Sequence, residues 1–596
     1  MIVTEFLVHL VPSIPFKYRI YNFHGPQMPT NQTETPRTSR ISIFLIIGAG
    51  TLFLLIPFLL LGMPARRDFA EHLHLARTSY YAILSGNLIP SWPGDVNGGY
   101  GDLSARFYPP ALPFTWAATR IFIKSWFWSA VTVFTVISFV GGIGAYQWAK
   151  QFMPSKLAAW AGFLYMSTPY HISDFFQGSL MAEYAAACLV PFAFAFTEKI
   201  CRGGTRRDIA GLGASYSLVI LFDLPIGVIA SYALLFYFLV RLDWSKTITS
   251  FAQFAAGLGL GLLCSACYLV TVLAELPWLR KDPGSAFSVD TFLFTSFHSF
   301  PGDTGVFYMN YLTYATWGLL LPAGILLARQ YRAINRSLLM GVGALTIFSF
   351  FMAMKISYPL WLILPKLMEV QIAWRWLLIS SIGTSLLLAA CIPAWWRIAT
   401  GKRRPLALLA LGSVLLSFAF MISHTIREAA YHSPSEVEIL SVVLRGSRGL
   451  PQWFPIWVTG EIPEMLDEAA AEGRTIEVTQ LSPEHRTFAI GAGPAPEVRI
   501  RSLYYPHWVA TAGGKQLDTH PAPDGVLMIS IPPEAVTINL DFREPPRVLV
   551  SGIISVIAWL LLVALFVFGG RKTSNAAPAQ AETVPSETAL PETVEV

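Results

Sequence analysis

The run Ile41–Gly62, ISIFLIIGAGTLFLLIPFLLLG, decides the class of this protein, because it carries no charged side chain over 22 residues. About 20 consecutive apolar residues suffice to cross the hydrocarbon core of a bilayer. Similar runs recur along the chain of 596 residues, of which 54% are hydrophobic and only 13% charged. Soluble domains carry about 25% charged residues, so the composition predicts an all-α polytopic membrane protein. The net charge of +5 is small and spread over short loops, so we expect no nucleic-acid partner.

We predict twelve transmembrane helices, one for each apolar run of near-spanning length. They cover residues 41–62, 126–149, 157–171, 184–200, 208–222, 224–240, 248–275, 311–329, 336–354, 374–396, 405–424 and 547–570. Lys and Arg gather in alternate loops, at residues 150–156, 199–207, 241–246, 329–336, 397–404 and 571–572. Because short basic loops stay in the cytoplasm, we expect both termini inside, in the cytoplasmic (inner) membrane of a bacterium. The segment 109–123 is apolar but short and bracketed by prolines, so we interpret it as a helix lying at the outer surface.

The chain divides by composition into a polar leader, a GT-C-like transmembrane domain with two outer loops, a β-rich outer domain, a last span and a tail. These segments are residues 1–40, 41–424 (outer loops 63–125 and 172–183), 425–546, 547–570 and 571–596. The leader carries no cleavable signal peptide. Short alternating runs between turn residues predict a small extracytoplasmic β-sandwich in the outer domain, with a helix over 463–473. The tail is rich in Ala, Pro, Glu and Thr, which predicts disorder.

The first outer loop holds the most informative polar residues. Asp68 and His72 lie four positions apart, so on a helix they share one face, where they could act as a base and its orienting partner or hold a cation. The alternative is a solvated face of an interfacial helix. Trp92, Tyr100 and Tyr108 follow in a stretch dense in Gly and Pro, and they either line a ligand cavity or anchor the chain at the interface.

Four further candidates lie at the outer ends of predicted spans. Asp174 and Glu183 bracket the second outer loop, where carboxylates near the bilayer are costly and often functional, although Asp near a helix N-terminus is also favourable as a cap. Gln371 and Arg375 open the span at 374. Arg375 either extends to the interface or grips a phosphate by paired hydrogen bonds.

Together these motifs resemble a known bacterial membrane family. Asp68-x-x-x-His72, Gly99-Tyr100-Gly101, Asp174-x-x-Gln177-Gly178-Ser179 and Gln371-x-x-Trp374-Arg375 are similar to motifs of the "6-pyruvoyl-tetrahydropterin synthase-related" family, akin to YfhO-type proteins. The resemblance spans most of residues 41–570. Its architecture is similar to that of GT-C superfamily glycosyltransferases, although Gln177 stands where the family is expected to have Arg.

The resemblance implies an enzyme that transfers a sugar from a polyprenyl-phosphate donor in the membrane lipid to an extracytoplasmic glycan, lipid or protein acceptor. Asp68 would act as catalytic base or orient the acceptor, with Asp174 and Glu183 assisting and Arg375 holding the lipid phosphate. A divalent cation, Mg²⁺ or Mn²⁺, is compatible with the carboxylates, although no ligand spacing requires one. The alternative is a non-enzymatic lipid-carrier binding or transport protein, or an assembly protein for envelope glycans. A channel or secondary transporter fits less well, because the candidate charges crowd the ends of the spans rather than their middles.

Overall fold

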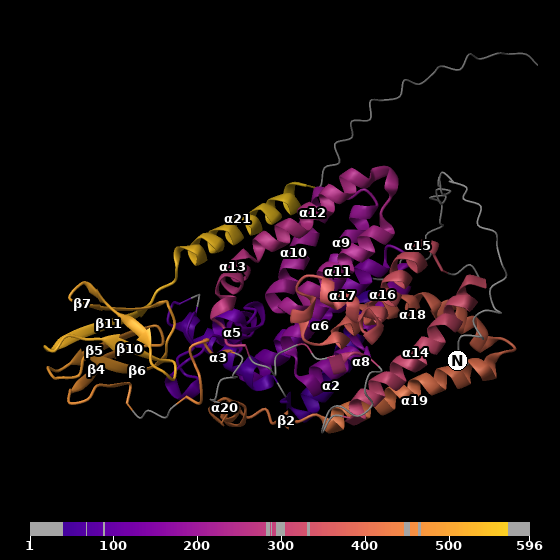
Figure 1. Cartoon of the computed structure of the whole chain (residues 1–596). Helices are drawn as coiled ribbons and strands as arrows, with labels where there is room; N and C mark the ends of the chain where they lie inside the picture. Colours follow the sequence, from indigo (N-terminus) through magenta and orange to yellow (C-terminus); the bar gives the residue numbers. More distant parts are fainter. Residues whose placement is uncertain are drawn as a thin grey trace, which may run out of the picture. The chain divides into compact units, whose positions relative to one another are not determined.

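The computed structural model describes residues 40–569 except 67, 88–89, 282–286, 288, 294–303, 331–333, 446–452 and 463–466 (Figure 1). The expected leader up to residue 39 and the tail from residue 571 fall outside the described residues. Most of the described chain is helical, and the strands gather near its C-terminal end, as predicted.

Within the described residues, eight helices are long and apolar enough to cross a membrane, judged by length and composition. They are α2 (Arg40–Leu61), α6 (Trp126–Ala149), α9 (Met181–Cys201), α11 (Leu224–Arg241), α12 (Thr247–Cys264), α18 (Leu377–Thr400), α19 (Arg404–Glu428) and α21 (Pro546–Phe568). The other four predicted spans coincide with helices too: α7 (Ser155–Met166), α10 (Arg206–Phe222), α14 (Thr304–Gln330) and the segment from α15 (Arg336–Leu338) through η7 (Leu339–Gly343) to α16 (Ala344–Met352). Because α7 has only 12 residues, it is about 18 Å long. The number twelve therefore stays a prediction.

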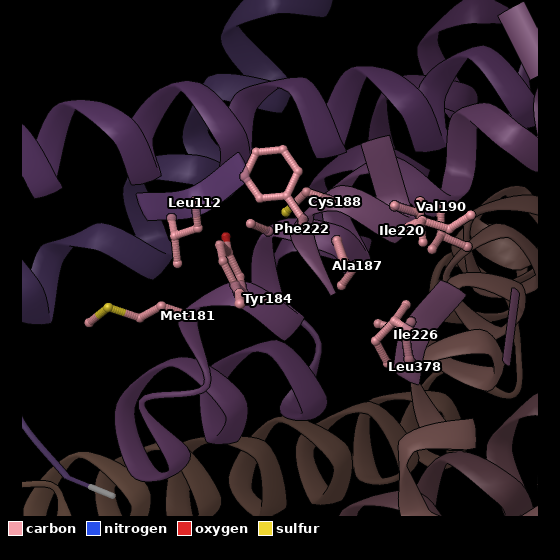
Figure 2. Packing of buried hydrophobic residues seen from close by; sticks show 14 of the residues in the cluster. Leu112, Met181, Tyr184, Ala187, Cys188, Val190, Ile220, Phe222, Ile226 and Leu378 are labelled. Atoms are coloured by element: carbon pink, nitrogen blue, oxygen red, sulfur yellow. The ribbon is translucent and has the colours of Figure 1, made fainter. Parts of the chain in front are cut away.

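Helix α9 is packed among α6, α10 and α11. Small residues allow this close approach: a Cβ added at Gly141 of α6 would lie 2.8 Å from Cys188 Cβ of α9. Figure 2 shows the apolar core around α9, with labelled side chains from α5, α9, α10, α11 and α18: Leu112, Met181, Tyr184, Ala187, Cys188, Val190, Ile220, Phe222, Ile226 and Leu378. This packing fixes the first turn of α9, which carries a candidate site residue.

The first polar segment folds into short elements rather than a span. They are α3 (Phe69–Leu84), η1 (Asn97–Gly99), α4 (Ser104–Phe107) and α5 (Ala111–Ile123). Helix α5 has 13 residues, about 20 Å, too short to cross a bilayer. Just before α3, strand β1 (Met63–Pro64) pairs with β2 (Tyr431–His432), so this segment is joined to the chain that follows α19.

The β-rich region consists of two antiparallel sheets. One has the order β4-β5-β11-β7-β8 and the other β3-β6-β10-β9. Their strands are β3 (Ala469–Ala470), β4 (Ile476–Leu481), β5 (His485–Ile490), β6 (Glu497–Leu503), β7 (Trp508–Ala512), β8 (Lys515–Leu517), β9 (Thr519–Pro521), β10 (Val526–Ser530) and β11 (Val536–Phe542). Side chains alternate between buried and less buried along β5 and β6, as expected for strands with one face in a core.

The helix expected over 463–473 is wrong in its described part. Ala469 and Ala470 form β3 and pair with β6. Just before them, the Arg501 N–H donates to the Glu468 carbonyl at 2.9 Å, and the two side chains form an ion pair. Tertiary pairing thus overrides the helix preference of the Ala- and Glu-rich run.

A buried ion network ties the β-rich region to the helices. Glu275, fully buried at the end of α13 (Ala266–Glu275), accepts two hydrogen bonds from Arg106 of α4, at 2.8 and 2.9 Å. It also accepts from Tyr505 Oη at 2.6 Å and from Arg547 of α21 at 2.8 Å. Arg106 pairs in addition with Glu544. The first polar segment, α13, the sheets and α21 therefore meet at one carboxylate.

Candidate functional site

The centre of the candidate site is an ion pair between two buried residues far apart in sequence. Glu183 lies in the first turn of α9, and Arg375 lies in η10 (Ala373–Trp376), immediately before α18. Arg375 Nε donates to Glu183 Oε2 at 2.8 Å, and Arg375 Nη1 donates to the Val370 carbonyl at 2.7 Å. Tyr170 Oη donates to the other oxygen of Glu183. These bonds use two of the five guanidinium N–H groups.

Two more carboxylates act electrostatically on this pair. Asp174 lies on the π-helical turn η2 (Ser173–Gly178), is 6% exposed, and its Oδ2 has no hydrogen-bond partner among the described residues. Burial, and then the charge of Glu183, raise the pKa of Asp174 well above its ordinary value, although Arg375 opposes the shift. Asp223 caps α11 by accepting from the Ile226 N–H at 2.8 Å. Burial raises the pKa of Asp223 to about 7, again opposed by Arg375.

Asp68 is the exposed member of the carboxylate group. It occupies the N-cap position of α3, where its side chain makes no capping bond. Its charge acts on the pKa of Asp174, Asp223 and Glu71, which places all of them within electrostatic reach of Asp68. The N-terminal end of α3 favours the ionised carboxylate. Asp68 is thus an accessible carboxylate beside a buried acidic cluster.

His72 and Tyr108 form a hydrogen-bonded pair next to this cluster. Burial lowers the pKa of His72 to about 3, so the ring is neutral near pH 7. The Met181 N–H donates to His72 Nε2 at 3.2 Å, and Tyr108 Oη lies 3.1 Å from His72 Nδ1. Because Nε2 accepts, the proton of the neutral ring belongs on Nδ1, which donates to Tyr108 Oη. The Tyr108 hydroxyl keeps its own proton to donate elsewhere, and burial followed by the charge of Asp68 raises the pKa of Tyr108 well above its usual range.

The remaining predicted residues lie in other positions. Trp92 is 1% exposed and packs on Trp508 and Phe542 of the β-rich region, with ring centroids 5.7 and 5.4 Å apart. Tyr100 is also buried, and its carbonyl accepts from the Leu503 N–H at 2.9 Å. Both therefore join the first polar segment to the sheets. Gln371 lies between η9 (Leu367–Val370) and η10, in a left-handed conformation with φ 69°.

Three members of the cluster were not among the residues predicted for the site. Burial, and then the charges of Asp102 and Asp68, raise the pKa of Glu71 to about 8. Its Oε1 has no hydrogen-bond partner in the described chain. Its position three residues after Asp68 was the available signal, since i and i+3 are neighbours on a helix. Asp223 and Tyr170 gave weaker sequence signals. Asp223 stands at a turn before Leu224-Pro225, and Tyr170 stands just before the second outer loop.

The arrangement suits proton transfer and phosphate binding. An exposed carboxylate can take a proton from a hydroxyl group, and a desolvated arginine can stabilise charge on a phosphate. A divalent cation fits less well: within the described residues, no three His, Cys, Asp or Glu side chains are placed to hold a metal ion. Among the buried carboxylates, Glu183 is engaged with Arg375 and Tyr170, and Asp223 caps α11.

Comparisons with known proteins give matches among solved structures and one family match. Among solved structures, the chain is similar to the cryo-EM structure of the arabinosyltransferase EmbB from Mycobacterium smegmatis, with 11% identity and a TM-score of 0.36, over 84% of this chain and 62% of that chain. The chain thus spans about three fifths of the length of that protein. No curated protein matches it.

The family match covers residues 105–430, more than half of the chain. That region includes Tyr108, Asp174, Glu183, Gln371 and Arg375 and ends before the sheets. The matched model describes a membrane protein, which agrees with the apolar helices. This chain belongs to the family of membrane proteins described as 6-pyruvoyl-tetrahydropterin synthase related.

Proposed function

We propose that this protein is an integral membrane glycosyltransferase. It would transfer a sugar from a polyprenyl-phosphate donor to a hydroxyl group of a glycan, lipid or protein acceptor on the extracytoplasmic side of the cytoplasmic membrane. The observation that carries the proposal is the grouping of Asp174, Glu183 and Asp223 around the buried Arg375, with Asp68 within electrostatic reach of Asp174 and Asp223. Family membership and the similarity of the architecture expected from the sequence to that of GT-C enzymes support it.

In the proposed reaction the acceptor oxygen attacks the anomeric carbon of the donor sugar. The bond from that carbon to the phosphate oxygen breaks, and polyprenyl phosphate leaves with the bonding electrons. Asp68 takes the acceptor proton, a role open to an exposed carboxylate. Arg375 offers its remaining N–H groups to the leaving phosphate, whose negative charge grows as the bond breaks. Both residues precede helices, α3 and α18, and α18 is long enough to span a bilayer that would hold the lipid.

The other residues of the cluster position these two. Glu183 and Tyr170 hold the Arg375 guanidinium in place, and His72 and Tyr108 link α3 to the start of α9. Burial raises the pKa of Asp174, which disfavours a negative charge beside a phosphate. In this mechanism a single carboxylate, that of Asp68, faces the acceptor.

Lipid-linked sugars in cells lacking the gene test the proposal. The deletion strain is complemented with wild type, Asp68→Asn or the exposed control Glu369→Gln, and polyprenyl-phosphate sugars are measured by mass spectrometry. We expect a polyprenyl-phosphate sugar to accumulate in the deletion strain and with Asp68→Asn, and to be cleared by wild type and Glu369→Gln. If Asp68→Asn, made at the wild-type level, restores the wild-type pattern, a lipid-carrier binding or transport protein replaces the enzyme.

A further inference from the structure

A cavity of about 850 Å³ lies between the first polar segment and the β-rich region, away from Arg375 and Glu183. Its described lining comes from the C-terminal half of α3, the loop that follows α3, and the β4–β5 hairpin with the neighbouring strand β6. Pockets for small organic ligands have volumes of roughly 300–1,000 Å³. The space is thus far larger than a single ion needs.

Most charged groups around this cavity already have protein partners. Arg77 pairs with Asp95 at 3.0 Å, and Arg501 pairs with Glu468. Glu484 accepts hydrogen bonds from the Ser91 N–H at 2.6 Å, the Trp92 N–H at 3.2 Å and Asn87 Nδ2 at 2.9 Å. These carboxylates are occupied by donors in the protein.

Arg486 differs from these groups. It is 3% exposed, yet no carboxylate of the described chain lies within 4.0 Å of its guanidinium, and its Nε has no hydrogen-bond partner there. Its Nη1 donates to the Arg501 carbonyl at 2.8 Å, and its guanidinium lies 5.4 Å from the ring centroid of Trp508. Burial without a compensating carboxylate lowers the pKa of Arg486 to about 10. A desolvated cation lacking a counterion is unfavourable unless an anion completes the site.

The guanidinium also reaches the cavity wall. A Cβ added at Gly94, which lines the cavity, would lie 3.7 Å from Arg486 Nη2. Tyr81, 53% exposed, supplies an aromatic ring on the same lining, with the Arg77 guanidinium 5.4 Å from its centroid. The cavity could therefore hold a ligand with an anionic group at Arg486 and a polar ring against Tyr81.

We propose that this cavity binds an acidic saccharide, whose carboxylate or phosphate group is held by Arg486 and whose sugar rings lie against Tyr81. This deepens the proposed function, on which it rests, by assigning the acceptor to the class of anionic glycans. Helix α3 links the two sites: Arg77, on the cavity lining, lies nine residues after Asp68, about 14 Å along the helix axis and half a turn around it. An acceptor anchored at Arg486 must therefore be an oligosaccharide long enough to pass around α3 for its hydroxyl group to reach Asp68.

Binding to the full-length protein, in nanodiscs of neutral phosphatidylcholine, tests this proposal without any turnover. Calorimetric titrations use a uronic-acid tetrasaccharide, a neutral tetrasaccharide of the same length and inorganic phosphate. The variants are Arg486→Gln and the control Arg543→Gln, an exposed arginine paired with Asp541 at 3.0 Å and outside the cavity lining. We expect the acidic tetrasaccharide to bind wild type and Arg543→Gln alike, and Arg486→Gln about tenfold or more weakly.

Two outcomes overturn the proposal. Equal affinity for the acidic and neutral tetrasaccharides, or unchanged affinity in Arg486→Gln, would show that the cavity has no anion site. Inorganic phosphate that binds as tightly as the acidic tetrasaccharide would show that the site does not recognise the saccharide. If Arg486→Gln does not fold, Arg486→Lys and Tyr81→Ala replace it, and each must weaken the acidic ligand. If the acidic tetrasaccharide does not bind but Asp68→Asn loses sugar transfer, the proposed function stands and only the saccharide site is overturned. Binding of the acidic tetrasaccharide with no sugar transfer by wild type overturns the proposed function and the assignment of the saccharide as acceptor, and leaves the binding site itself.

Discussion

Arg375 Nε donates to Glu183 Oε2 at 2.8 Å across 192 positions of sequence. Both side chains are almost fully buried, and each supplies the counterion that compensates the buried charge of the other. The pair joins the first turn of α9 to the turn before α18, and it holds the guanidinium that we assign to the donor phosphate.

Glu183→Gln should destabilise the protein strongly, because it leaves the Arg375 charge buried without a counterion. Breaking such a pair costs about 3–5 kcal/mol, measurable as a lower unfolding temperature of the purified protein. The control is Glu369→Gln, which disrupts the exposed pair with Lys366 and should change stability by about 1 kcal/mol or less. Equal unfolding temperatures for the two variants would show that the Glu183–Arg375 pair does not stabilise the fold.

The contribution of Glu71 to the stability of the native state should fall as the pH rises from about 4.5 to about 8. Burial, reinforced by Asp102 and Asp68, raises the pKa of Glu71 from 4.5 to about 8, so the folded chain keeps a proton that the unfolded chain releases. Stability then decreases with pH between the two values. Glu71→Gln should flatten this slope in denaturation series at pH 5, 6, 7 and 8, with Glu369→Gln as control. A slope unchanged by Glu71→Gln would contradict the assignment.

Gly101→Ala should destabilise the protein more than Gly98→Ala. Both glycines have positive φ, 75° and 65°, so an Ala at either position adopts a disfavoured backbone conformation. Only at Gly101 does the added Cβ also collide, 2.2 Å from Trp92 Nε1, whereas nothing lies within 4 Å at Gly98. We expect about 1 kcal/mol for Gly98→Ala and clearly more for Gly101→Ala. Identical unfolding temperatures would show that Trp92 is not held against this turn.

Glu275→Gln should loosen the β-rich region from the helices. The substitution leaves the guanidinium groups of Arg106 and Arg547 without their shared carboxylate. Tyr505→Phe removes only one hydrogen bond to Glu275 and should have a smaller effect, about 1.5–3 kcal/mol. Limited proteolysis should cut Glu275→Gln faster than Tyr505→Phe between α19 and α21. Wild-type cleavage rates in Glu275→Gln would mean that other contacts hold this region.

The helices were predictable because their signal is local. The apolar run 126–149 coincides with α6, since uninterrupted apolar length alone defines such a helix. The run 463–473 misled for the same reason: its Ala and Glu residues favour a helix locally, and the pairing of β3 with β6 that overrides them is not visible nearby in sequence.

The candidate site was predictable only in part. Polar residues at the ends of spans pointed to Glu183 and Arg375 separately, but their contact depends on how α9 packs beside the segments before α18. Trp92 and Tyr100 share the loop of Tyr108 in sequence, and the fold turns them toward the sheets instead. Arg486 gave no signal, because one arginine in a strand looks like an ordinary solvated residue until its burial is known.

Transfer of a radiolabelled sugar from a synthetic polyprenyl-phosphate donor by the purified protein in nanodiscs tests the central claim most directly. Wild type and Glu369→Gln should release polyprenyl phosphate and label the acceptor, and Asp68→Asn should be slower by about 10²–10⁴-fold, the usual contribution of a general base. Because Asp68 is exposed and makes no capping bond, the substitution should change the unfolding temperature only slightly, through the lost interaction with the N-terminal end of α3. Transfer by a folded Asp68→Asn variant at the wild-type rate would contradict the assignment of Asp68 as the base.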